Sequence, residues 1–256
     1  ILQKLKKTLE QSLNVIYQSK LVNEFYKEVL DYRLFSDCLC ISIPIFENND
    51  DILSELYTIF ILISSFQYLM LLNGFLLRGG VAIGSYYSDP TMIFSGGLVK
   101  AYHIEAYKAN NPIVMIDEGI TRIIRSKTNN DLSDILSRIL LVDYNNDNIT
   151  FINPMIPLNL MYDLTAHNFN SIFQDEDSYF LFKKLFDQIS KQMMNLKQSF
   201  SEKYLKNEIH KSIRLFTELN LVKFNQNNKV KSKYLWLKDF IDWFENKNNK
   251  FGHFNF

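Results

Sequence analysis

The feature that most constrains this chain is one long apolar segment, which runs from Ile52 to Leu77. The segment is long enough to cross a bilayer as a helix. It contains Glu55, Gln67 and Asn73, however, and a strand-like stretch follows its Asn-Gly end. Length and polarity together favour a helix buried on a β-sheet over a membrane span.

Composition indicates a folded domain that does not bind duplex nucleic acid. Hydrophobic residues make up 47% of the 256 residues and the net charge is zero, whereas a protein that neutralises phosphates is usually basic. From Asn195 onward twelve Lys/Arg face six Asp/Glu, and we interpret this excess as a solvated helical face rather than a nucleic-acid surface. Nucleic acid is therefore an improbable partner, and a membrane is not expected.

Two cysteines, Cys38 and Cys40, lie in one apolar run. Residues two apart on a strand project to the same face and are poorly placed for a disulfide, and no further cysteine completes a zinc site. We expect both to be core thiols in a reducing compartment. Because the first residues form an amphipathic pattern rather than a signal peptide, the prediction is a cytoplasmic protein.

The order of expected elements indicates an α/β (α+β) sandwich with a mostly antiparallel sheet and a helical C-terminal region. We expect a core over residues 1–128 and a C-terminal extension over residues 129–256 that packs on it. The expected elements are a helix at 3–30, a hairpin at 33–45, a helix at 52–72, strands at 75–87 and 92–94, a helix at 98–109, a strand at 112–116, a helix at 118–125, a hairpin at 140–152 and long helices from 175 to 246.

Three segments stand in an order that resembles class III nucleotide cyclases. They are FSD at 35–37, LLRGGVAIG at 76–84 and FSGGLVKAYHIE at 94–105. The chain is more similar still to a divergent bacterial group of cyclase-like proteins, which also has a late segment of the type KYLWL, found here at 233–237. The resemblance implies a cyclase-like, ferredoxin-like core.

The resemblance also implies the residues of a site. Asp37 matches a carboxylate that binds Mg²⁺ or Mn²⁺, although Ser-Asp also suits the tip of a hairpin turn. Arg78 matches the arginine of the family's strand motif and is a candidate to reach phosphate oxygens, with an arginine paired to an acid such as Asp89 as the alternative. Lys100, at the exposed start of a helix, is a candidate phosphate contact, with a solvated lysine as the alternative. The expected nucleotide-binding residues are completed by Arg33, Gly79, Gly80, Gly96 and Gly97.

The three glycines at 79, 80 and 84 indicate a close approach to the backbone, either by a neighbouring element or by a ligand. Glu105 is expected to pair with Lys108 or Lys100 on one helix face. His103 is the one histidine in these segments, and we expect it to be packed or solvent-facing.

Several positions depart from the cyclase pattern. Lys100 stands where cyclases place an Asn for the ribose, Ile104 where they place an Arg for the phosphates, and Ile93 where some members place a base-selecting carboxylate. The Asp-Ile-Leu-Gly-Phe strand end that holds the second metal carboxylate in this group is not found in the 256 residues. One metal carboxylate alone does not support two-metal chemistry.

The resulting expectation is a cyclase-like homodimer that binds a nucleoside triphosphate with a divalent metal and forms a cyclic nucleotide. The alternative is a catalytically inactive member that senses a nucleotide or serves as a scaffold, which the changes at Lys100 and Ile104 favour. A nucleic-acid-binding accessory rests only on the basic C-terminal part.

Overall fold

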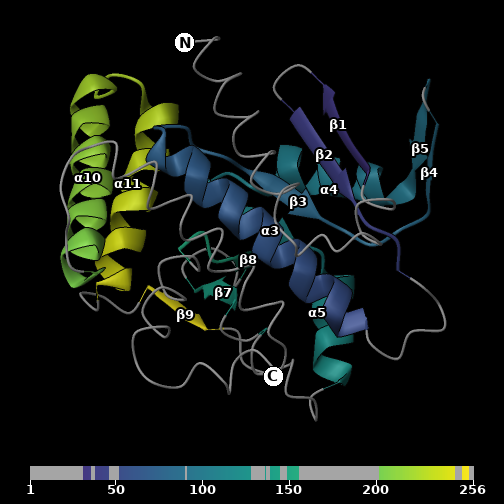
Figure 1. Ribbon diagram of the computed structural model, residues 1–256. Helices are drawn as coiled ribbons and strands as arrows, with labels where there is room; N and C mark the ends of the chain where they lie inside the picture. The colour runs from purple at the N-terminus through teal and green to yellow at the C-terminus, as the bar shows by residue number, and fades with distance from the viewer. Residues whose placement is uncertain are drawn as a thin grey trace. The chain divides into compact units, whose positions relative to one another are not determined.

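The computed structural model describes residues 31–35, 38–45, 52–89, 91–127, 136, 139–144, 149–155, 202–245 and 250–253 (Figure 1). The chain divides into two compact units. The first consists of Ile1–Phe75 and Pro154–Glu202, and the second consists of Leu76–Asn153 and Lys203–Phe256. The expected helix at 3–30 and the part of the C-terminal helices before residue 202 lie outside the described residues.

The first unit contains the expected hairpin. Strands β1 (Asp31–Phe35) and β2 (Cys38–Ser42) pair antiparallel, with Arg33 opposite Cys40. Among the described strands these two pair only with each other. That this hairpin lies next to the 75–87 segment therefore stays a prediction.

The expectation of two core thiols is wrong for Cys38, which is exposed. Cys38 pairs with Phe35 as the last pair of the ladder beside the turn, where fewer neighbours can cover it. Cys40, two residues further along, is half-buried, and burial together with the charge of Asp31 raises the pKa of its thiol. Neither cysteine forms a disulfide.

The apolar segment forms one helix, α3 (Ile52–Leu72), as expected. It ends because Gly74 adopts a φ of 83°, which turns the next peptide so that the Phe75 N–H donates to the Met70 carbonyl oxygen at 2.9 Å. The Gly74 N–H donates to the Leu71 carbonyl oxygen, also at 2.9 Å. The Asn73 side chain adds a hydrogen bond to the Leu69 carbonyl oxygen. The Asn-Gly pair therefore acts as the predicted stop signal.

Helix α3 is the one candidate membrane span among the described residues. Its window Glu55–Leu72 is apolar enough to cross a bilayer, but 83% of that window is buried. Burial of this extent favours a core helix of a soluble protein over a membrane span. Its packing on the five-stranded sheet of the second unit stays a prediction.

The second unit is built on a mixed five-stranded sheet with the order β3-β6-β8-β7-β9. Its strands are β3 (Gly79–Val81), β6 (Val114–Ile116), β8 (Ile149–Ile152), β7 (Leu140–Asp143) and β9 (Phe251–His253). β3 and β6 pair parallel, and the other neighbours pair antiparallel. The mixed α/β class is confirmed, and one sheet joins strands from both sides of residue 128.

The prediction of one strand over 75–87 is wrong. This segment contains two short strands, β3 and β4 (Tyr86–Ser88), which pair with different partners. β4 pairs antiparallel with β5 (Ile93–Ser95), while β3 pairs with β6. The break between β3 and β4 falls at Gly84, whose backbone lies against the backbone of Gly97 at the start of the next helix. This close contact leaves no room for a side chain at position 84.

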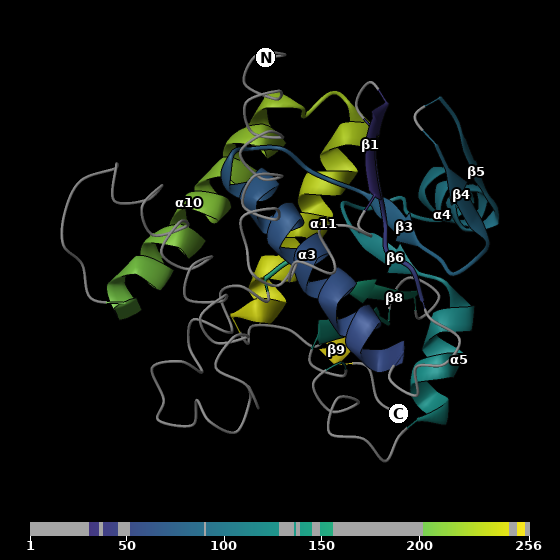
Figure 2. The ribbon, with the colours of Figure 1, turned by 45° about the vertical axis from the view of Figure 1, so that its right-hand side comes forward.

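Two helices of the second unit confirm the sequence predictions. Helix α4 (Gly96–Tyr107) begins two residues earlier than expected because Ser95 caps it, and Figures 1 and 2 both show it beside β3. Helix α5 (Glu118–Ser126) is capped by Asp117, whose carboxylate accepts a hydrogen bond from the Gly119 N–H at 3.1 Å.

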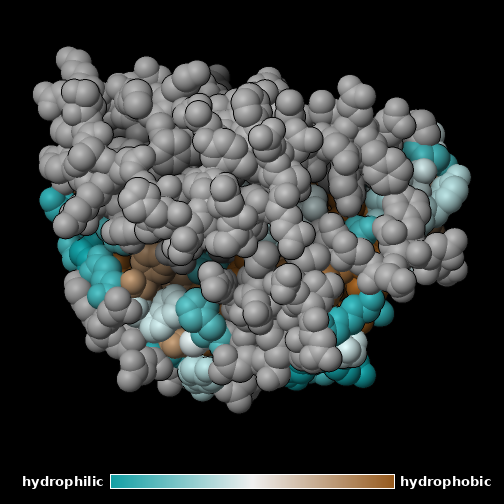
Figure 3. Space-filling view, turned by 60° about the horizontal axis from the view of Figure 1, so that its bottom comes forward, coloured by the Kyte–Doolittle hydropathy of each residue, from teal (hydrophilic) through white to brown (hydrophobic). Residues whose placement is uncertain are grey.

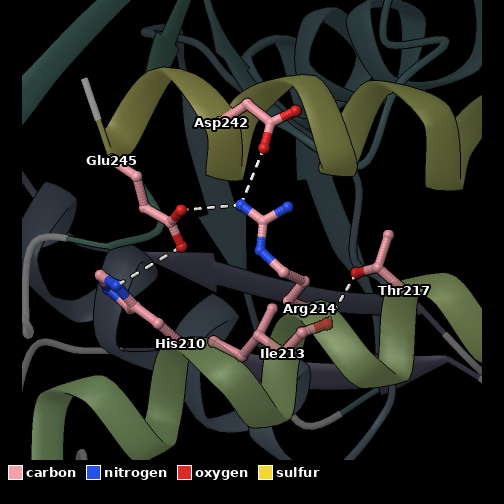
Figure 4. Close-up of polar contacts among 6 residues, drawn as sticks. All are labelled: His210, Ile213, Arg214, Thr217, Asp242 and Glu245. Carbon is pink, nitrogen blue, oxygen red and sulfur yellow. Dashed lines mark hydrogen bonds and ion pairs between the residues drawn. The ribbon is translucent and has the colours of Figure 1, made fainter. Parts of the chain in front are cut away.

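The C-terminal helices α10 (Glu202–Lys223) and α11 (Asn228–Phe244) form a hairpin held by one arginine. Arg214 on α10 donates to Asp242 at 2.7 Å and to Glu245 at 2.8 Å (Figure 4). The imidazole of His210 lies 4.0 Å from the other oxygen of Glu245. Because Arg214 is only a quarter exposed, its two carboxylate partners compensate the burial of its charge.

Helix α11 packs on the sheet through an aromatic cluster. Phe151 of β8 and Phe251 of β9 meet Trp236 and Phe240 of α11, with ring centroids between 5.3 and 6.2 Å apart. The indole of Trp236 also donates to the carboxylate of Asp143 at 3.0 Å, and Asp143 is buried on β7. Strand β9, which the sequence pattern does not predict, is held by this cluster.

Figure 3 shows one face of the molecule on which the described residues present hydrophilic surface at the margins and hydrophobic surface between them. Apolar atoms are normal on protein surfaces, so the single exposed residues need no special explanation. Two groups of neighbouring exposed apolar side chains are larger than such single residues, and both belong to the second unit. One lies on β4, β5 and α4, and the other lies on α10 and α11.

Replacement of Trp236 by Phe should destabilise the second unit by about 1–3 kcal/mol, because buried Asp143 loses a donor while an aromatic ring is kept. Chemical denaturation of the variant and the wild type measures this. The matched control is Trp243→Phe, since Trp243 contacts Phe240 and Phe251 in the same cluster. Equal losses in the two variants would contradict a special contribution of the bond to Asp143.

Candidate functional site

The candidate site is built where β3 runs along α4. Gly80 lies against the Ala101 carbonyl oxygen and the Ile104 side chain, and a Cβ at this position would come within 2.8 Å of the Ile104 Cβ. Gly84 lies in the same way against the backbone of Gly97. The close approach predicted from the glycines is therefore made by a neighbouring helix. Gly79 faces the side chain of Val114 instead.

The N-terminal end of α4 is a polar turn. The hydroxyl of Ser95 accepts a hydrogen bond from the Leu98 N–H at 2.9 Å and donates one to the Ser85 carbonyl oxygen at 3.0 Å. Among the described residues, a Cβ at Gly96 would meet the Ser85 hydroxyl at 3.2 Å, and no other described atom crowds that side of the Gly96 backbone. Amide groups at a helix N-terminus attract anions.

Lys100 adds a positive charge to this turn. Its ammonium group donates to the Ile83 carbonyl oxygen at 3.3 Å, and the side chain is exposed. The bond holds the lysine next to the loop that follows β3. The Leu98 N–H is bonded to Ser95 and the Gly97 N–H to the Ser85 carbonyl oxygen, so among the described residues the first turn of α4 offers the Gly96 amide together with one cation to a phosphate group.

Arg78 contacts the C-terminal end of α4. Its Nε lies 2.5 Å from a carboxylate oxygen of Glu105, and its Nη1 donates to the Ala109 carbonyl oxygen at 3.4 Å. The expected pairing of Glu105 with a lysine on its own helix is thus replaced by a bond to the strand end. Because the two side chains are 37% and 26% exposed, the pair stabilises the fold only modestly.

Asp89, the acid suggested as a partner for Arg78, has other contacts. Its carboxylate accepts hydrogen bonds from the backbone and hydroxyl of Thr91, from the Met92 N–H and from the Tyr87 hydroxyl. These bonds close the connection between β4 and β5. They also lower the pKa of Asp89 to about 2, with the Thr91 hydroxyl as the largest cause.

The charges of Arg78 and Glu105 act on Lys233 of α11. Burial lowers the pKa of Lys233 first, and the positive charges of Arg78 and Lys229 lower it further, while Glu105 opposes them. The segments LLRGG, KAYHIE and KYLWL belong to one unit, and charges from all three influence one another. We call Arg78, Glu105 and Lys233 the strand-end cluster. The sequence places Lys233 in a family segment but predicts no contact for it.

The remaining predicted site residues are not brought together in the described part of the chain. Asp37 lies outside the described residues. Arg33 belongs to the first unit, where its Nε lies 3.2 Å from Asp31. Arg78 and Lys100 lie in the second unit but contact different turns of α4. The predicted convergence of Asp37, Arg78 and Lys100 on one cleft stays a prediction.

The fit of a divalent metal depends on Asp37. Within the described ranges, no group of three or more His, Cys, Asp or Glu side chains is arranged to hold an ion. His103 is exposed on α4 and stacks at 4.7 Å against Tyr107, in agreement with the expectation for this histidine. The described residues alone therefore do not supply a metal centre.

The carboxyl of Asp89 should titrate near pH 2, well below the usual value of 3.8. A lowered pKa means that the bonds to Asp89 stabilise the fold above about pH 4 and lose this effect as the pH falls through about 2. Replacement of Thr91 by Val should move the midpoint back toward the usual value. Carbon-detected NMR of the side-chain carboxyl measures both, and an unchanged midpoint in Thr91→Val would contradict the assigned cause.

No family model, no curated protein and no solved structure matches this chain. The resemblance to class III cyclases accordingly remains a prediction from the three ordered segments and the late KYLWL segment.

Proposed function

We propose that this chain is a cytoplasmic, nucleotide cyclase-like protein that binds a nucleoside triphosphate together with Mg²⁺ or Mn²⁺ and forms a cyclic nucleotide. The observation that carries the proposal is the first turn of α4. There Lys100 is held at the Ile83 carbonyl beside the open backbone of Gly96, a combination that suits the charge of a phosphate group. Two cysteines that form no disulfide support a reducing compartment.

Each residue has a distinct part in this proposal. Gly96 offers its amide to a phosphate oxygen, and Lys100 supplies a positive charge at the same turn. Asp37 would hold the divalent cation, which neutralises the phosphates and activates the attacking hydroxyl when bound. Arg78 can contact a phosphate only if its ion pair with Glu105 breaks. We therefore propose that Arg78 acts as a positioning residue, which holds the strand end against α4 through Glu105.

A second candidate is a cyclase-like protein that binds a nucleotide without turnover. Ile104 favours it, because this side chain is 6% exposed and packs against Gly80. Cyclases place an arginine for the phosphates at this position, whereas here the position serves the core. Loss of that charge would remove transition-state stabilisation while leaving ground-state binding possible.

The proposed homodimer is supported by an exposed aromatic face on the second unit. Tyr87 and Phe94 stand opposite each other on β4 and β5 and are 57% and 79% exposed. Val99 and Tyr102 of α4 are also more than 60% exposed. Aromatic side chains are enriched in the centres of protein interfaces, so this face suits a second copy.

Replacement of Lys100 by Ala should weaken binding of a nucleoside triphosphate roughly tenfold, since a charged hydrogen bond contributes about 1.5–3 kcal/mol. Titration calorimetry with each of the four triphosphates and Mg²⁺ or Mn²⁺ measures this. Lys108→Ala is the matched control, because Lys108 is exposed at the opposite end of α4. Equal binding by the wild type and Lys100→Ala would refute the phosphate site.

Replacement of Asp37 by Ala should abolish product formation, because loss of a metal ligand removes several kcal/mol of transition-state stabilisation. Mass spectrometry of the same incubations detects any cyclic product, and circular dichroism checks the fold. Product from the wild type but not from Asp37→Ala supports the cyclase. Binding without product in every condition supports the inactive sensor or scaffold.

A further inference from the structure

The hairpin of α10 and α11 carries an apolar face that no other described residue covers. Leu215, Leu219 and Val222 follow a spacing of four and three residues along α10, and they are 57%, 60% and 78% exposed. Residues at this spacing share one side of a helix. The opposite side of α10 contributes the buried Ile213 and Thr217. The helix thus presents a second apolar stripe to solvent in addition to its core-facing one.

The stripe opens into a groove at the tip of the hairpin. The groove has a volume of about 360 Å³ and is lined by Leu221, Val222, Asn225, Lys231 and Leu235. Leu235 of α11 is 45% exposed. The ammonium group of Lys231 donates to the Asn225 side-chain oxygen at 2.5 Å, which fixes a positive charge at the edge of an apolar hollow. We call this region the hairpin groove.

The hairpin groove lies in a stretch of one-sided charge. From Leu219 to Lys238 the sequence has no Asp or Glu and five lysines: Lys223, Lys229, Lys231, Lys233 and Lys238. The chain as a whole is neutral. Lys231 lines the groove, and Lys223 and Lys229 lie close to its lining residues in sequence, while Glu218 and Asp239 stand one helical turn from Val222 and Leu235. The excess of lysine complements an acidic partner, and like charges would oppose a second copy that brought its own lysines to the same place.

The chemistry of the hairpin groove also argues against two other kinds of occupant, a nucleic acid and a bilayer surface. Nucleic acids stack bases on exposed aromatic rings, but Trp236 and Tyr234 are buried here, and Lys223 covers the Phe224 ring at 5.2 Å. A bilayer surface suits a long apolar helix face, whereas the apolar lining of the hairpin groove is limited to Leu221, Val222 and Leu235 in a shallow, open depression. An apolar side chain from a protein helix fits a hollow of this kind.

We propose that the hairpin groove docks an acidic amphipathic helix of a partner protein. Its apolar side chains would enter between α10 and α11 beside Val222 and Leu235. Its carboxylates would face Lys223, Lys229 and Lys231. The few exposed apolar residues make this a small interface, so the complex is transient and its affinity is on the order of micromolar.

A synthetic helical peptide tests the proposal. The probe peptide has 18 residues, with leucines spaced by four and three residues and glutamates on both sides of the leucine stripe. The control peptide is the same except that lysines replace the glutamates. Fluorescence anisotropy with the full chain should show binding of the glutamate peptide at least tenfold tighter than binding of the lysine peptide. Raising the salt from 50 to 500 mM should weaken the first complex. Equal binding of both peptides, or of neither, would overturn the proposal.

The hairpin groove itself is tested by one substitution. Val222→Asp places a charge in the groove at a position 78% exposed, so the fold should be retained. It should weaken binding of the glutamate peptide at least tenfold, while Val99→Asp, at a 68% exposed site on α4, should leave it unchanged. The proposal is overturned if Val222→Asp instead abolishes self-association in sedimentation or binding to phosphatidylserine vesicles, with peptide binding intact.

Discussion

The packing of α11 on the five-stranded sheet is the interaction on which the second unit depends. Four aromatic rings from α11, β8 and β9 meet in one cluster, and the indole of Trp236 satisfies the buried carboxylate of Asp143. Aromatic burial supplies most of the stabilisation, and the hydrogen bond fixes the position of the helix along the sheet. Lys233, one turn earlier on α11, reaches the strand-end cluster because of this placement. The same helix thus links the core, the segments that resemble cyclases and the hairpin groove.

Local signals in the sequence were sufficient for most elements of the second unit. The strand β6 and the antiparallel pair of β7 and β8 were both expected from patterns of a few residues. The end of the strand before Gly84 was missed, and the close approach of Gly84 to Gly97 is one that no local pattern reveals. Strand β9 was missed for a related reason. Its three residues become a strand only through pairing with β7 and contact with the cluster around Trp236.

The candidate site shows the same division between local and long-range information. The sequence indicated that Arg78, Lys100 and the glycines belong near one another; in the structure Arg78 and Gly80 contact α4, Lys100 of α4 contacts the loop after β3, and Gly79 faces β6. The acid suggested for Arg78 was Asp89, which is near in sequence, whereas its partner Glu105 is brought close only by the path of the chain. Lys233 enters from a helix more than 100 residues away, and its effect is electrostatic. Such a contact depends on the complete tertiary fold.

The pairing of β9 with β7 has a consequence for how the sheet forms. His253 lies opposite Leu141, which stands 112 positions earlier, so this edge closes only after a long stretch of chain has been brought together. Closing so long a loop is slow compared with forming the hairpin of β7 and β8. Until β9 arrives, β7 presents a row of unpaired backbone groups, which is a template for association with another chain. The second unit is therefore expected to pass through a folding stage in which one sheet edge is open, and the short strand at Phe251–His253 acts as its protection against aggregation.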